Sequence, residues 1–90
     1  MAKLKFSQRL SRALELPADA ALPMPRLEIT GRDDILITGG AVLLEYSPEL
    51  IRVGRERCVV AISGTELRIL AMDKMGMQIA GRIASVEFGE

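Results

Sequence analysis

Residues 62–88, ISGTELRILAMDKMGMQIAGRIASVEF, consist of short apolar runs that end at turn-forming residues and carry no obvious reactive side chain. Ile62-Ser63-Gly64 and Ile79-Ala80-Gly81 follow one pattern, in which a β-branched residue precedes a small residue and a glycine. The same pattern occurs earlier, at Ile29-Thr30-Gly31 and Ile37-Thr38-Gly39. Short apolar runs that are repeatedly bounded by turn residues are typical of an all-β fold.

This repetition predicts a mainly β protein with about eight short strands, arranged either as a meander or as a solenoid-like sheet. The sequence leaves these two arrangements open. Gly39-Gly40 and Ser63-Gly64 suit two-residue hairpin turns, because glycine adopts positive φ without steric cost. Gly81 leaves almost no loop, so we expect the chain to bend or bulge there. The expected strands are 26–30, 34–38, 41–46, 49–53, 57–62, 65–71, 75–80 and 82–88.

Several of these runs are apolar on both faces, which implies that something covers the second face. The runs are ILI at 35–37, VLL at 42–44 and CVVAI at 58–62. A strand with one solvated face would instead alternate apolar and polar residues, as the stretch around Leu67 and Ile69 does. We expect an N-terminal amphipathic helix to cover part of that face and a partner chain to cover the remainder.

The N-terminal segment, 1–25, is predicted to form a basic amphipathic helix at 4–16 followed by a proline-rich connector, and 26–90 the all-β domain. Apolar residues recur at helical spacing, with basic residues on the opposite side. Pro17 ends the helix, because proline disfavours the α conformation in the residue before it. Such a helix can bind an anionic membrane or a partner groove, or pack on its own sheet. The candidate contact residues are Lys5, Phe6, Arg9, Leu10 and Arg12.

Composition argues against an enzyme or a metal protein. The 90-residue chain has no histidine and one cysteine, so Cys58 lacks the usual base for a nucleophile and zinc lacks its usual ligands. Cys58 is interpreted as a small core residue, and Asp33-Asp34 as a polar turn. No cofactor is expected. No run is long and apolar enough for a membrane span, and a lone cysteine suits a reducing cytoplasm.

Charge gives one alternative function. The formal net charge is zero, so no overall field favours nucleic acid. Arg52, Arg55 and Arg57 cluster around a glycine and could form an anion-binding hairpin, although a solvated hairpin of mixed charge explains them better. Sheets that bind nucleic acid usually present stacking aromatics, and aromatic residues make up only 3% of this chain. No nucleic acid is therefore expected as a partner.

Several short motifs, taken in order, resemble the YabP/YqfC family of bacterial sporulation proteins, and within it the YqfC-like branch. The resemblance covers nearly the whole chain. The matching stretches are Glu15-Leu16-Pro17 with Asp19, Pro25-Arg26 with Ile29 and Gly31, Tyr46 with Glu49, Ile51 and Arg52, Gly64 with Leu67, and Ile79-x-Gly81-x-Ile83 ending in Val86-x-Phe88.

The resemblance implies a role in endospore formation in the mother-cell cytoplasm, with peripheral contact at the forespore membrane. It also implies a companion, the integral membrane sporulation protein (YqfD-like) encoded beside YqfC-like members, and no established catalytic residues. We therefore expect a non-enzymatic β module that self-associates or binds this membrane-embedded partner. Edge pairing is expected through the final strand, around Val86 and Phe88, because unpaired strand edges recruit other strands.

Overall fold

The computed structural model describes residues 6, 8 and 25–89, and within them six antiparallel strands form one open sheet. The strands lie in the order β1-β2-β6-β5-β4-β3. Four of them are short and two are long, and their bounds are β1 (Arg26–Thr30), β2 (Asp34–Thr38), β3 (Val42–Tyr46), β4 (Leu50–Arg55), β5 (Cys58–Met72) and β6 (Gly76–Gly89).

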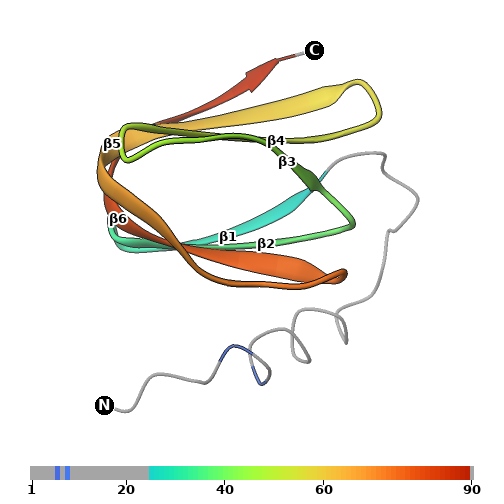
Figure 1. Ribbon diagram of the computed structural model, residues 1–90, viewed down its shortest axis with the longest axis horizontal. Coiled ribbons are helices and arrows are strands. Elements are labelled where there is room, and N and C mark those ends of the chain that lie inside the picture. Colours follow the sequence, from blue (N-terminus) through green and yellow to red (C-terminus); the bar gives the residue numbers. More distant parts are fainter. Residues whose placement is uncertain (1–5, 7, 9–24, 90) are drawn as a thin grey trace.

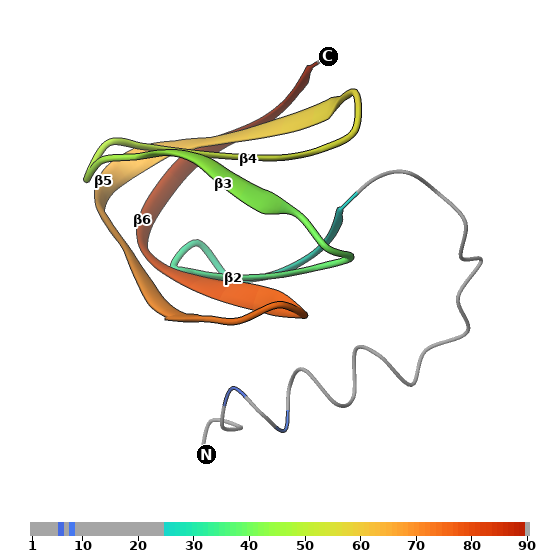
Figure 2. The ribbon, with the colours of Figure 1, turned by 45° about the vertical axis from the view of Figure 1, so that its right-hand side comes forward.

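The two long strands bend near their middles and fold the sheet over on itself (Figure 1). One layer, here called the β2 layer, contains β1, β2, the first half of β6 and the second half of β5. The other, the β4 layer, contains β3, β4, the first half of β5 and the second half of β6. Figure 2 shows β5 and β6 running continuously from one layer into the other. Each long strand therefore has a second strand neighbour along only one of its halves.

Gly64 and Gly81 allow this bend, because the two long strands approach most closely there. A side chain at Gly64 would collide with the carbonyl oxygen of Arg82, and one at Gly81 would lie 2.7 Å from the carbonyl oxygen of Glu66. Gly81 also has a φ of 140°, a conformation that favours glycine. The register of β5 against β6 shifts in this region, which is the signature of β-bulges and of strong local bending. The bend expected at Gly81 is thus confirmed.

The turn between β1 and β2 supports the bend of β6. The backbone N–H of Gly81 donates to the carbonyl oxygen of Asp33 (3.3 Å), and that of Ile83 donates to the carbonyl oxygen of Arg32 (2.8 Å). These bonds satisfy backbone groups of β6 at the point where the ladder with β2 has ended. Asp33 therefore belongs to a turn, as its sequence context predicts.

The turn between β3 and β4 supports the bend of β5 in the same way. The N–H of Gly64 donates to the carbonyl oxygen of Glu49 (3.1 Å), and the N–H of Leu67 to that of Pro48 (2.8 Å). The two halves of the molecule are consequently built alike, each from a short hairpin whose turn caps one bent strand.

The core lies between the two layers and is aliphatic, as the scarcity of aromatic residues requires. Its buried members are Ile35, Ile37, Ile51, Val53, Val60, Ile62, Leu67, Met77, Ile79 and Ile83. Leu36 alternates with two of these residues, so it points to the opposite side of the sheet, yet it is also buried. β2 is therefore covered on both faces, as its apolar sequence predicts.

The prediction of eight short strands in a meander or solenoid is wrong. The expected strands 57–62 and 65–71 are one strand, and so are 75–80 and 82–88. Ser63-Gly64 lies within β5 and does not form a hairpin turn. The strand order is not a simple meander, because β6 lies between β2 and β5. A bulge and a glycine can redirect a strand without breaking its ladder, so a local turn signal need not end the strand.

The expected N-terminal helix is not supported, since the described part of the chain contains six strands and no helical element. Of the expected helix, 4–16, only Phe6 and Gln8 are described, and two isolated residues define no element. Lys5, Arg9, Leu10 and Arg12 lie outside the described residues, as does nearly all of the proposed segment 1–25. Within the residues that the structure covers, no helix is long and apolar enough to cross a membrane.

Candidate interaction surface

The outer face of the β4 layer carries exposed aliphatic side chains and few charges. Core residues of β4 and β5 point inward, so their neighbours in sequence point outward. Gly54, which follows the core residue Val53, faces outward. Val42 is opposite Gly54, so it also faces outward, and it is 59% exposed. Leu44 is 50% exposed and covers Gly54, where an added Cβ would lie 2.8 Å from the Cδ1 of Leu44. Val59 and Ala61 continue the aliphatic surface onto β5, which gives a patch across three strands.

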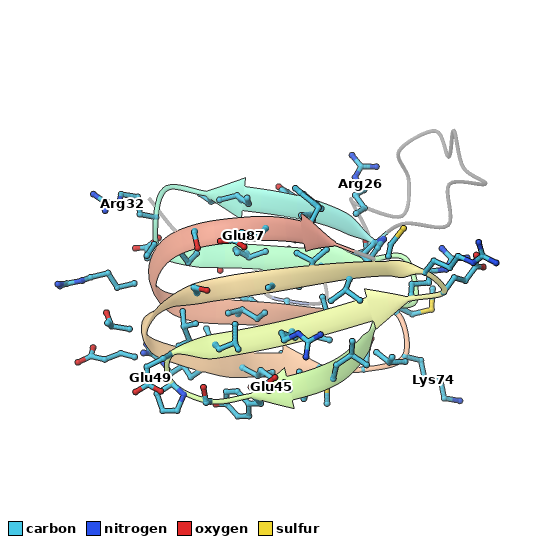
Figure 3. All side chains as sticks on the ribbon, turned by 90° about the horizontal axis from the view of Figure 1, so that it is seen from above. Arg26, Arg32, Glu45, Glu49, Lys74 and Glu87 are labelled. Atoms are coloured by element: carbon cyan, nitrogen blue, oxygen red, sulfur yellow. The ribbon has the colours of Figure 1, made fainter. Side chains whose placement is uncertain are left out.

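Charges on this face are few and largely compensated. Arg52 Nη1 lies 3.3 Å from Glu45 Oε1, in an ion pair that is open to solvent. Glu87 is opposite Ala61 and lies on the β6 side of the face. Figure 3, which looks onto this layer, shows Glu45 and Glu87 on opposite sides of it, with Arg32, Glu49 and Lys74 at the ends of the molecule. Aliphatic groups with a polar rim form the usual composition of a protein-binding surface.

The outer face of the β2 layer is more polar. Its alternating positions include Arg26 and Glu28 on β1, Asp34 on β2 and Arg68 on β5. Gln78 Nε2 donates a hydrogen bond to Asp34 Oδ1 (3.0 Å). Leu70, which is 53% exposed, lies with these polar residues, whereas Val42 and Leu44 lie together on the β4 layer.

Val86 and Phe88 lie in the second half of β6, at the edge of the β4 layer. They pair with Ile62 and Val60 of β5 on one side. In the described part of the chain no strand lies on the other side, because β2 pairs with β6 only at 76–80. Phe88 is 64% exposed, although its register places it on the same face as the core residue Val60.

The three arginines of the alternative anion site do not gather into one cluster. Arg52 lies within β4 and is paired with Glu45. Arg55 ends β4, and Arg57 lies in the two-residue turn that follows, beside Glu56. One of the three cations is thus already compensated on the sheet face, and the other two flank an acidic residue.

An open depression of about 830 Å³ lies beside the bend, under the turn between β1 and β2. Three of its lining residues are cationic and three are anionic: Arg32, Arg68, Arg82, Asp33, Asp34 and Glu66. This balance gives the depression no net charge with which to attract an ion. Among the described residues, no group of three or more histidine, cysteine or acidic side chains is placed to hold a metal ion. Cys58 is a free thiol of intermediate exposure.

Sequence reasoning did not single out the residues of the aliphatic face. The signal was present, because VLL at 42–44 and CVVAI at 58–62 are apolar on both faces. The structure buries one side of each run in the core and leaves the other side at the surface. Which side remained open depended on the bend of β5 at Gly64, where the sequence predicted a hairpin turn.

Comparison with known proteins places the chain in a family. A model of the YabP family matches residues 22–90. The chain is also 32% identical over 88 residues to the uncharacterized protein YqfC of Bacillus subtilis (strain 168), an alignment that covers 98% of this chain and 95% of YqfC. No solved structure gives a significant match. Since the family model spans most of the sequence and the relative aligns along nearly its full length, the chain belongs to the YabP family.

Proposed function

We propose that the protein is a non-enzymatic β module of endospore formation, which works by binding protein through the outer face of the β4 layer. Membership of the YabP family suggests a sporulation-associated protein. The proposed partner is either a second copy of the chain or a membrane-embedded sporulation protein of the YqfD-like kind, with the module at the cytoplasmic surface of the forespore membrane.

The observation that supports this proposal is the exposure of Val42 and Leu44. Both side chains are at least half exposed, on a sheet face where Val59 and Ala61 extend the aliphatic surface. Burying such groups is favourable by roughly 25 cal/mol per Å² of apolar surface removed from water. A folded monomer gains nothing from keeping them exposed, whereas a complex that buries them is stabilised.

The experiment replaces both exposed residues by glutamate, as Val42→Glu/Leu44→Glu, in the organism's own sporulating cells. Each carboxylate would be buried without a partner in the complex, at a cost of a few kcal/mol, and about 1.4 kcal/mol already weakens binding tenfold. We therefore expect the yield of heat-resistant spores to fall by about tenfold or more. The matched control is Leu70→Glu, because Leu70 is 53% exposed but lines the depression on the β2 layer.

Protein levels and thermal unfolding midpoints of both variants should match those of the wild type, since all three side chains are at least half exposed in the fold. Normal sporulation of the double variant at wild-type protein levels would overturn the proposal. An equal defect in the Leu70→Glu control would show that the effect is not specific to the aliphatic face.

A further inference from the structure

Within the described residues, the second half of β6 has backbone hydrogen-bonding groups that no neighbouring strand pairs with. The hairpin between β4 and β5 closes at the pair Arg55 and Cys58 around a two-residue turn, so these two residues direct their N–H and C=O groups at each other. Direction then alternates along an antiparallel ladder. Val59, Ala61 and Ser63 therefore face β6, and their partners on β6 face back.

The residues between those partners face outward. Val86 and Phe88 pair with Ile62 and Val60 at the positions where β5 directs its groups toward β4. Their own N–H and C=O groups must consequently point away from β5, to the open side of β6. The N–H of Ile83 also points away from β5, because it donates to the carbonyl oxygen of Arg32. Ile83 and Val86 share this direction because the register shifts between Ser85 and Ile83.

The equivalent edge in the other half of the molecule is closed. On the second half of β5, the N–H of Leu67 donates to Pro48, and the N–H of Ile69 donates to the hydroxyl oxygen of Tyr46 (3.4 Å). Tyr46 immediately precedes the turn between β3 and β4. The corresponding position before the turn between β1 and β2 is Thr30, for which the described residues contain no such bond to β6. The open side of β5 is therefore hydrogen-bonded as far as Ile69, whereas the second half of β6 has no equivalent bond within the described residues.

The two remaining edges are poorer templates for pairing. β1 has five residues, two of which are the charged Arg26 and Glu28. β3 also has five residues, and its register is broken between Leu43 and Glu45. Charges and bulges are the usual features that protect an edge strand from pairing. Residues 85–89 of β6 lie beyond their own bulge and keep a regular register with β5.

We propose that this edge of β6 pairs antiparallel with the same edge of a second copy, about a two-fold axis at Val86. This inference rests on the proposed function, and of the two partners proposed there it selects the second copy of the chain. With this register, each Val86 lies opposite its symmetry mate, and each Ser85 lies opposite Glu87 of the other copy, where its hydroxyl can donate to the carboxylate. Shifting one strand by two residues places Glu87 opposite Glu87, and like charges at opposite positions disfavour that register.

The charge and exposure of the chain fit this partner. The formal net charge is zero, so two copies do not repel each other. Phe88 is 64% exposed at the inner side of the open edge, and pairing shields it. The two β4 layers would join into one sheet of eight strands, and their aliphatic outer faces would become one continuous surface.

The first test measures the molar mass of the full chain by light scattering, from micromolar to millimolar concentration. We expect the wild type to become dimeric as the concentration rises, and Val86→Pro to remain monomeric. Proline removes an N–H that points to the open edge and that the ladder with β5 does not use. Val86→Thr is the matched control, because it keeps the N–H and the branched shape, and it should dimerise like the wild type.

A second test does not depend on how well the proline variant folds. In a Cys58→Ser background, one cysteine is introduced as Val86→Cys or as Glu87→Cys. Opposed residues of a hydrogen-bonded pair have Cα atoms about 5.5 Å apart, within the range that a disulfide spans. We expect oxidation to cross-link the Val86→Cys protein and to leave the Glu87→Cys protein uncrosslinked.

A wild type that stays monomeric at every concentration would overturn the inference, and so would cross-linking at position 87 in place of position 86. The proposed function fails separately. If no dimer forms but Val42→Glu/Leu44→Glu still abolishes sporulation, the binding surface stands and its partner is the membrane protein. If Val86→Cys cross-links while the glutamate variant sporulates normally, dimerisation stands without the proposed face.

Discussion

Gly64→Ala is expected to lower the free energy of unfolding by about 3 kcal/mol or more, which is a large part of the total stability of a domain of this size. The added methyl group would collide with the carbonyl oxygen of Arg82 and would lie 3.0 Å from its carbonyl carbon. Both atoms belong to the backbone of β6, so no side chain can move aside. Relief requires β5 and β6 to separate where the two layers join, and the adjacent ladder would be lost.

Urea denaturation followed by circular dichroism measures this effect. The matched control is Gly89→Ala, because Gly89 is also in a long strand but has nothing within 4 Å of an added Cβ. We expect the control to keep the wild-type midpoint. A Gly64→Ala protein with the wild-type midpoint would mean that the two strands do not approach as closely as the structure describes.

Ile79→Ala is expected to lower the free energy of unfolding by about 2–5 kcal/mol, the usual range for emptying a buried aliphatic site. Ile79 is fully buried at the centre of the β2 layer, between Ile35 of β2 and Ile69 of β5. β6 is held here by ladders on both sides, to β2 and to β5, so the backbone cannot collapse into the cavity that the substitution leaves. The van der Waals contacts of the removed side-chain atoms are therefore not replaced, and the cost of the cavity adds to the loss of stability.

Ile29→Ala provides the comparison, because it removes the same atoms from a site in the same layer. Ile29 pairs with Ile35 as well, but it lies on the edge strand β1 and is 49% exposed. We expect its cost, in the same denaturation experiment, to be about half that of Ile79→Ala or less. Equal costs for the two substitutions would contradict the assignment of the core to the space between the layers.

The sequence predicted the β class and parts of the strand pattern because those depend on neighbouring residues. The expected strands 26–30 and 34–38 coincide with β1 and β2. Gly39 and Gly40, expected in a turn, both have positive φ in the connection that follows β2. In each case the deciding residues are adjacent in the chain, so local pattern was sufficient.

The bend at Gly64 could not be predicted in this way. Ser63-Gly64 has the composition of a hairpin turn, and whether the chain reverses or continues depends on what lies against it. Here β5 continues because the backbone of Arg82 in β6 packs against Gly64, and because the N–H of Gly64 donates to the carbonyl oxygen of Glu49 in a distant turn. These contacts join residues far apart in sequence, and a pattern of neighbours does not contain them.

The candidate surface was missed for a related reason. Outward orientation of Val42 and Leu44 follows from the register of β3 on β4, which shifts between Leu43 and Glu45. A shift of one residue reverses the faces of a strand, so alternation along the sequence does not identify the exposed side. Val86 and Phe88 lie beyond the part of β6 that pairs with β2, and the contact expected of them stays a prediction.

Site-specific photo-crosslinking in sporulating cells tests most directly whether this protein works by contact through the β4 layer. A photoreactive residue replaces Leu44 in one strain and Leu70, on the opposite face, in another. We predict that the probe at position 44 cross-links to a second copy of the chain or to an epitope-tagged YqfD-like membrane protein, and that the probe at position 70 cross-links to neither. Absence of both products at position 44, or equal yields from the two positions, would contradict the account.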